Sequence, residues 1–284
     1  MMRSRPAALV AALLLHAVAL AAPLRAQQPA AASATPLELD HILLLVPPGA
    51  EAGVARLRAA GLSVANEPTR HTGQGTASIG VLFDNAYLEL LWIDSTVRRD
   101  RGLGLDIDRW KRVPAASRVG IGLRRVGVPP APAPKTDAQG LAIRVPPRPM
   151  PDPGVPSRRY AAAWMPANTA VLLLRQPAES LAAELFVVQD EIALPWWVAQ
   201  VRHDATILLM HPGKWQRVRR VIVHGPATQA PAAFTRVHPA RVELRTDASS
   251  AATWVEIEFE ARGAPPRTVD LRPTLPLVLR RQAP

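Results

Sequence analysis

The order of the apolar segments near the start of the chain limits the folds that it can adopt. Residues 37–46 (LELDHILLLV) have the length and apolar density of a buried strand, and the PPG segment that follows ends it. Residues 50–60 favour a helix by propensity, and Gly61 stands where a helix C-terminal cap belongs. The sequence therefore predicts a strand followed directly by a short helix.

Three further strands are expected in short succession. Residues 62–67 are predicted to return as a short strand, and a polar, glycine-rich loop (RHTGQGT) follows them. The apolar runs 77–83 and 86–93 flank Asp84 and Asn85, a dipeptide typical of hairpin turns. The predicted order is thus strand, helix, strand, strand and strand within fewer than 60 residues.

The remainder of the chain is also rich in predicted strands. Residues 118–126 (RVGIGLRRV) alternate as a strand does. Further strand-like runs lie at residues 141–145, 159–165, 170–174, 185–189, 217–223, 242–245, 254–260 and 275–280. Glu256, Glu258 and Glu260 alternate onto one face, which we interpret as the solvated face of an edge strand. The predicted fold class is a strand-rich α+β protein.

The first 26 residues have the layout of a secretory signal peptide. Arg3 and Arg5 precede an apolar run at 7–22, which is shorter than the roughly 20 residues of a membrane-spanning helix. We therefore expect cleavage after Ala26, a short linker at 27–36, and export to the periplasm or beyond without stable membrane insertion. An uncleaved N-terminal anchor is the alternative.

The composition excludes several kinds of site and partner. The chain has no cysteine, so disulfide frameworks and thiol nucleophiles are ruled out. Lys and Arg total 34 against 23 for Asp and Glu, a formal net charge of +11. Residues 37–95, however, contain 3 basic and 7 acidic residues, so the positive charge lies elsewhere. No motif combines basic and aromatic residues as nucleic-acid binding requires, and no nucleic-acid partner is expected.

A histidine and a glutamate in two predicted strands are the main candidates for chemistry. Strand alternation puts Leu39, His41 and Leu43 on one face of the first strand. Glu89 lies in a strand that looks buried on both faces, where an ionised carboxylate is costly unless it is paired, metal-bound or protonated. His41 is its natural partner if the two strands are neighbours. Two interpretations stay open: a site for Zn, Ni, Mn or Fe, and a hydrogen-bonded pair that lines a barrel.

Three further residues are candidates for contacts to a substrate. Tyr87 shares a strand face with the glutamate, whereas Trp92 takes the opposite face. His71 lies with Gly73 and Gly75 in the polar loop, and the glycines allow a ligand to approach the backbone closely. A tight connection with an exposed histidine is the alternative for this loop.

Three phrases in the first 95 residues together resemble a known family. LDHILLLVPPG, RHTGQGT and FDNAYLELLWI, in this order, are similar to the glyoxalase-like branch of the vicinal oxygen chelate superfamily. The resemblance implies paired βαβββ modules that form an open, cup-shaped barrel, with module one at residues 37–95. It also implies a divalent metal bound through His41 on the first strand and Glu89 on the last.

By the same comparison, the second module at residues 118–190 is degenerate. GIGLRR resembles its opening strand but has no histidine, and VPPAPAPKTDA, which cannot form a regular helix, stands where the helix belongs. ELFVVQDE resembles the closing strand and puts Gln189 in the position of a third metal ligand. HPGKW, from His211, resembles a phrase that follows the second module in similar proteins. We therefore expect a glyoxalase-like domain at 37–210 and a strand-rich extension at 211–284.

The resemblance leaves two classes of function open. The first is a metal-dependent lyase, isomerase or dioxygenase for a small oxygenated substrate, with Glu89 as the catalytic residue and the metal as a Lewis acid. The second is a metal-free protein that binds or sequesters a small molecule in the same cup. His71, Tyr87 and Trp92 are expected to contact that molecule. Pairing of modules between two chains, as a homodimer, also stays open.

Overall fold

A computed structural model gives the fold of the chain. All the elements described below belong to one compact unit, Ala34–Pro284. The expected signal peptide, most of the expected linker and the strand expected at 141–145 lie outside the described residues. The structure describes residues 34–100, 117–129, 146–175, 183–200, 207–226, 232–247 and 252–282.

The first half of the large sheet has the predicted order of elements. These are β1 (Leu37–Leu45), α1 (Glu51–Ala59), β2 (Thr69–His71), β3 (Thr76–Leu82) and β4 (Tyr87–Ile93). The prediction of a strand at 62–67 is wrong, because pairing with β3 starts only at Thr69. The preceding Pro68 has no N–H to donate to a sheet, so the strand begins after it.

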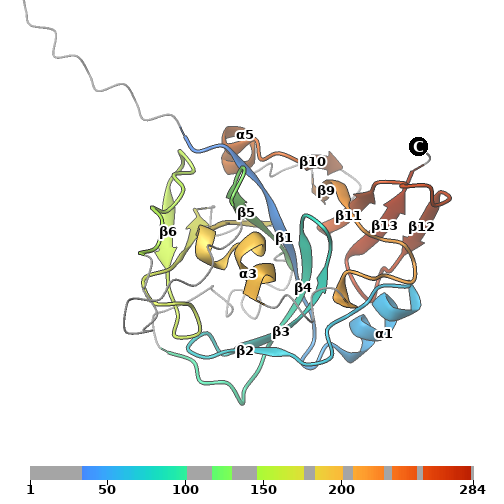
Figure 1. Cartoon of the computed structure of the whole chain (residues 1–284), viewed down its shortest axis with the longest axis horizontal. Coiled ribbons are helices and arrows are strands. Elements are labelled where there is room, and N and C mark those ends of the chain that lie inside the picture. The colour runs from blue at the N-terminus through green and yellow to red at the C-terminus, as the bar shows by residue number, and fades with distance from the viewer. Residues whose placement is uncertain are drawn as a thin grey trace, which may run out of the picture. The chain divides into compact units, whose positions relative to one another are not determined.

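The second half repeats the pairing pattern of the first. Its strands are β5 (Val119–Arg125), β6 (Ser157–Tyr160), β7 (Val171–Leu174) and β8 (Glu184–Val188). All eight strands form one curled sheet in the order β2-β3-β4-β1-β5-β8-β7-β6 (Figure 1). β4 lies parallel beside β1, β8 lies parallel beside β5, and β1 and β5 are antiparallel neighbours at the centre. The predicted α+β fold of paired, strand-rich modules is confirmed.

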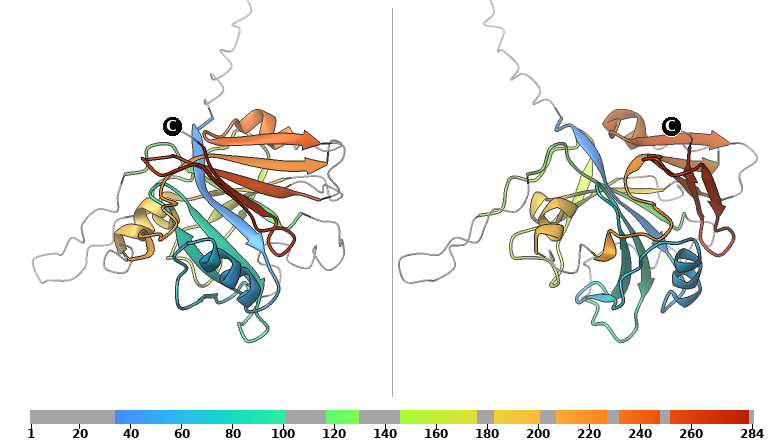
Figure 2. Two further views of the ribbon diagram at one scale, coloured as in Figure 1. Left: turned by 90° about the vertical axis from the view of Figure 1, so that its right-hand side faces the viewer. Right: turned by 45° about the vertical axis from the view of Figure 1, so that its right-hand side comes forward.

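A second, five-stranded sheet follows the first (Figure 2). After β8 come η1 (Asp190–Ile192), α3 (Leu194–Gln200), β9 (Val218–Pro226), α5 (Ala232–Val237), β10 (Val242–Asp247), β11 (Trp254–Phe259), β12 (Arg267–Asp270) and β13 (Leu277–Arg281). The strand order is β10-β9-β11-β13-β12, and of these strands only β12 was not predicted. Within the described part of the chain, no helix has the length and apolar character needed to cross a membrane.

The two sheets bury their apolar faces in a common core. Ile42 of β1, Val221 of β9 and Ile257 of β11 are all fully buried in it. α1 packs at the same core, where a Cβ on Gly53 would lie 3.0 Å from the side chain of Leu275. Because the second sheet covers one face of the large sheet, only the opposite face is left to line a binding site.

The glutamates of β11 do not lie on a solvated edge strand, so that interpretation of the sequence is wrong. β11 is the central strand of its sheet, and Glu256 and Glu258 are only 3% and 2% exposed. Arg280 Nη1 lies 3.2 Å from Glu256 Oε1, and Arg220 Nη2 lies 2.9 Å from Glu258 Oε2. Long arginine side chains cover these carboxylates. Strand alternation predicts which face a side chain is on, but not whether arginine side chains or water cover that face.

The side chain of Asn85 ties the β3–β4 turn to β9. Its Nδ2 donates to the carbonyl oxygen of Val218 at 2.8 Å, and the Val218 N–H donates to Asn85 Oδ1 at 2.9 Å. Both residues are buried. One amide therefore satisfies two backbone groups of the second sheet.

Asn85→Ala is expected to lower the free energy of unfolding by about 3 kcal/mol, because it leaves a buried N–H and a buried carbonyl without partners. Denaturant-induced unfolding measures the change. Asn66→Ala, on the exposed segment before β2, is the matched control and should change stability by less than about 0.5 kcal/mol. An equal effect of the two substitutions would contradict this role of Asn85.

His211, in the HPGKW phrase, is a buried structural histidine. The Ser63 N–H donates to His211 Nδ1 at 3.0 Å, and His211 Nε2 donates to the carbonyl oxygen of Leu82 at 2.7 Å. Burial lowers the pKa of His211 below its usual 6.5, and the bond to Leu82 and the charge of Asp84 oppose that shift only in part. The folded protein therefore holds this imidazole in its neutral form.

Stability is expected to fall as the pH drops through the unfolded-state pKa of about 6.5, because the unfolded chain then binds a proton that folded His211 does not. We expect His211→Asn to be less stable at neutral pH but to lose less stability between about pH 7.5 and 5.5. Chemical denaturation over this pH range measures both effects. A variant with the same pH dependence as the wild type would show that His211 is not the source.

Candidate functional site

A β-bulge in β1 brings Asp40 and His41 together. Leu39 pairs with Leu123 of β5 and His41 pairs with Gly122, so Asp40 is an extra residue in β1. Asp40 Oδ2 lies 2.8 Å from His41 Nδ1. Because a carboxylate only accepts hydrogen bonds, His41 donates from Nδ1, and its Nε2 is the acceptor of the neutral ring.

The bulge also changes which residues of β1 face the core. Leu39 packs in the core with Ile42, whereas His41 and Leu43 line a cavity on the other side. The prediction that Leu39 shares the face of His41 is therefore wrong, since an extra residue inverts the alternation between them.

The inner face of the large sheet lines a cavity of about 380 Å³. Most of the polar side chains on it come from the first half of the sheet and include His41, His71 and Glu89. Apolar side chains from the second half include Val171 and Phe186. The cavity thus has one polar wall and one largely apolar wall.

Glu89 of β4 lies between two imidazoles. Its Oε2 is 3.8 Å from His41 Nε2, and its Oε1 is 4.0 Å from His71 Nε2. The side chain of Glu89 is 13% exposed, and both imidazoles are more deeply buried. The parallel pairing of β1 with β4 brings His41 and Glu89 to the same part of the sheet, as expected if those strands were neighbours.

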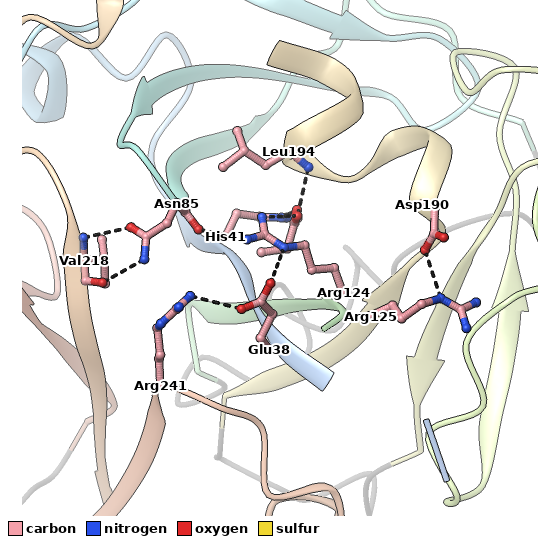
Figure 3. A network of polar contacts seen from close by, with 10 residues as sticks. Glu38, His41, Asn85, Arg124, Arg125, Asp190, Leu194, Val218 and Arg241 are labelled. Carbon is pink, nitrogen blue, oxygen red and sulfur yellow. Dashed lines mark hydrogen bonds and ion pairs between the residues drawn. The ribbon is translucent and has the colours of Figure 1, made fainter. Parts of the chain in front are cut away.

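Buried groups hold Asp40 and, through it, the His41 ring. Asp40 is fully buried, and its Oδ1 accepts from the Leu194 N–H at 2.9 Å and from Arg124 Nη1 at 3.3 Å. Figure 3 shows Leu194, Arg124 and His41 gathered at the start of α3. A Cβ on Gly122 would lie 2.5 Å from His41 Cε1, so the ring occupies space that only glycine leaves free.

The pKa of His71 and that of Tyr87 both depart from their usual values. Burial lowers the pKa of the His71 imidazole, and the Glu89 carboxylate opposes this shift. Burial raises the pKa of Tyr87 well above 10, and the charges of Glu89 and Asp40 raise it further. Tyr87 stacks on His41 with ring centroids 4.3 Å apart. At neutral pH both of these groups beside Glu89 are therefore uncharged.

Comparison with known proteins identifies the first half of this site. A family model described as "Glyoxalase-like domain" matches residues 39–164. Residues 39–164 are a glyoxalase-like domain. The match begins within β1 and extends past β6, so it includes His41, His71 and Glu89. The resemblance to the glyoxalase-like branch of the vicinal oxygen chelate superfamily is confirmed.

Other comparisons add little detail. A hypothetical protein from Staphylococcus aureus is similar to the chain at 11% sequence identity and a TM-score of 0.46. That alignment covers 87% of this chain and 98% of the other. Comparison with curated proteins gives no match.

The fold does not bring all the predicted site residues together. Tyr87 lines the cavity with His41, His71 and Glu89, whereas Trp92 lies on the other face of β4, in the core. Gln189 follows β8 and does not line the cavity. Its Oε1 accepts from the Ala170 N–H at 3.0 Å, and its Nε2 donates to the Arg148 carbonyl oxygen.

The donor set of the glyoxalase-like domain does not fit the metal that the resemblance implies. The nearest donors are His41, His71 and Glu89, with 3.8 and 4.0 Å between Glu89 and the two imidazoles. In the second half, β5 and β8 place Gly122 and Phe186 beside His41. No group of three or more His, Asp or Glu side chains among the described residues is arranged to hold a metal ion.

Several residues of the site were missed from the sequence. Asp40 directly precedes His41, and simple alternation assigns it to the wrong face. Gln74 stands between the two glycines of the polar loop, whose sequence indicates only a role for the backbone. Tyr160, Trp164 and Phe186 come from the second half, and no local pattern connects them to His41.

Gly122→Ala is expected to displace the His41 ring and to cost about 1–3 kcal/mol of stability through overpacking. Unfolding by denaturant measures the cost, and the imidazole resonances of His41 report the displacement. Gly225→Ala in β9 is the matched control, because its Cβ would meet nothing closer than 3.6 Å. Unchanged His41 resonances in Gly122→Ala would contradict the steric argument.

Proposed function

We propose that the protein binds a small organic molecule in the cavity of its large sheet and that Glu89 transfers a proton on that molecule. The observation that carries the proposal is the place of the Glu89 carboxylate, between two imidazoles on the polar wall. Cavities of about 380 Å³ hold small organic ligands. A carboxylate that is largely shielded from water is suited to act as a general base.

The two walls of the cavity favour one orientation of the ligand. Phe186 and Val188 of β8 offer apolar surface, with Met165 and Val171 beside them. An apolar body packs against this wall, which directs the polar end of the ligand toward Glu89.

The proposed step is removal of a proton from a carbon next to a carbonyl group. The C–H bond breaks, the proton goes to a Glu89 oxygen, and the electron pair forms an enolate on the ligand. After the proton on Glu89 exchanges with water, return of a proton to the same carbon gives exchange with solvent. In an α-hydroxy ketone, the hydroxyl proton can instead move to the former carbonyl oxygen while Glu89 returns its proton to the former carbonyl carbon, which gives isomerisation. His71 accompanies the step as a neutral hydrogen-bonding group, because burial lowers its pKa.

A second candidate function is binding without chemistry. The largely apolar wall from the second half of the sheet favours it, since that wall contributes affinity for a ligand but no reactive group. In this case Glu89 and the two imidazoles orient the ligand and do not act on it.

Exchange of carbon-bound hydrogen for deuterium tests the proposal. A panel of small α-hydroxy ketones is incubated with the full chain in D₂O, and proton NMR follows the loss of the signal next to the carbonyl. We expect exchange by the wild type and a loss of about 100-fold or more in Glu89→Gln, because the general base is removed. Ligand titrations should show that the variant still binds.

Glu67→Gln, on the exposed edge of the cavity, is the control and should exchange at nearly the wild-type rate. Exchange by Glu89→Gln at the wild-type rate would contradict the role of Glu89. Binding without any exchange by the wild type would favour the second candidate. Repeating the assay with EDTA and with added Zn, Ni, Mn or Fe tests the metal dependence implied by the resemblance.

A further inference from the structure

The polar loop between β2 and β3 turns one amide side chain into the cavity wall. Gln74 lines the cavity and is 4% exposed. Gly73 and Gly75 on either side have φ values of +90° and +73°, a region that favours glycine. The Gln74 N–H donates to the His71 carbonyl oxygen at 2.9 Å, which closes the turn. The two glycines thus fix the direction of the residue between them.

Two donors fix the orientation of the Gln74 amide. The Tyr160 hydroxyl lies 2.7 Å from Gln74 Oε1, and Trp164 Nε1 lies 3.2 Å from the same atom. The indole N–H is only a donor, so the atom that it contacts is the amide oxygen. Burial raises the pKa of Tyr160 to about 12, so its hydroxyl keeps its proton. Both contacts occupy the oxygen and leave the NH₂ group of the amide.

The NH₂ group of Gln74 is available to a ligand. Among the described residues it has no hydrogen-bond partner, although Gln74 lines the cavity. Trp164 contacts His71 with ring centroids 4.8 Å apart, and His71 in turn lies beside Glu89. The amide therefore stands close to the polar wall on which Glu89 lies, and it offers donors where Glu89 offers acceptors.

The charge of the cavity wall is opposite to that of the chain. The net charge of the chain is +11, yet no lysine or arginine is among the described residues that line the cavity. Three carboxylates line it: Glu67, Glu89 and Glu191. Glu191 Oε1 accepts from the Arg148 N–H at 2.6 Å, and its Oε2 is buried with no hydrogen-bond partner in the described part of the chain. These carboxylates would repel an anionic ligand, and no lysine or arginine among the described lining residues would offset the repulsion.

We propose that the cavity selects uncharged molecules that carry a carbonyl oxygen and an apolar ring, and that the NH₂ group of Gln74 donates to that oxygen. The inference rests on the proposed function, because it assumes that the cavity is the ligand site. It specifies the class of ligand, from which free carboxylates and phosphates are excluded. It also names Gln74 as a residue that recognises the ligand. The contacts of Tyr160 and Trp164 orient the NH₂ group of Gln74 before the ligand binds, so the side chain of Gln74 loses little conformational freedom on binding.

Three naphthalene probes of similar shape test the inference by calorimetric or NMR titration of the full chain at about pH 7.5, where a carboxylate is ionised. They are 2-naphthamide, which is neutral with a carbonyl, 2-naphthoate, which is anionic, and 2-methylnaphthalene, which has no acceptor. We expect 2-naphthamide to bind at least about 10-fold more tightly than 2-naphthoate.

Gln74→Glu separates recognition from structural support. The glutamate keeps an acceptor for Tyr160 and Trp164 but has no N–H donors when ionised. We expect it to weaken binding of 2-naphthamide about 5- to 10-fold and binding of 2-methylnaphthalene less than about 2-fold. Gln216→Glu adds the same charge at an exposed position outside the cavity and should change neither value.

The possible failures are distinguishable. If the wild type binds none of the three probes, the cavity is not a ligand site and the proposed function fails with the inference. If 2-naphthoate binds as tightly as 2-naphthamide, or if Gln74→Glu weakens the binding of both neutral probes equally, the inference fails. The cavity would still be a ligand site, so the proposed function would not fail with it. Gln74→Leu, checked for folding by its melting temperature, should reproduce the selective loss of 2-naphthamide.

Discussion

The extra residue in β1 is the constraint on which the rest of the site depends. Without the bulge at Asp40, either Leu39 or His41 would be on the wrong side of the strand. With it, leucines on both sides of the bulge reach the core while His41 reaches the cavity. The bulge also buries the Asp40 carboxylate, which would be costly if His41, Arg124 and the Leu194 N–H did not bind it.

The ion pairs around this bulge connect the two sheets. Arg124 of β5 donates to Glu38 at 3.1 Å as well as to Asp40, and Glu38 also accepts from Arg241, which directly precedes β10, at 3.0 Å. Figure 3 shows Glu38 between these two arginines. The position of His41 is therefore supported by residues far from it in the sequence. The segment that follows residue 210 belongs to the same compact unit.

The two halves of the large sheet share one pairing pattern but contribute different chemistry. Module one supplies His41, His71 and Glu89, whereas the strands of the second half supply mostly apolar side chains at the same cavity. In module two, the closing strand is followed by Gln189, which binds backbone groups and not the cavity. The resemblance predicted this loss of polar residues in the second half. It did not predict that Tyr160 and Trp164 would hold Gln74 from that side.

Local sequence patterns determined much of this protein: the opening strand and helix of module one, its hairpin, most of the later strands, and His41 and Glu89 as candidates on two strands that make a pair only if they are neighbours. These follow from hydrophobic period and turn chemistry, which act over a few residues. Only the tertiary structure decided the bulge at Asp40, the central position of β11 and the orientation of Gln74. Each of these depends on contacts between residues distant in the chain, such as Gly122 beneath His41 or Trp164 against Gln74, and no local pattern contains that information.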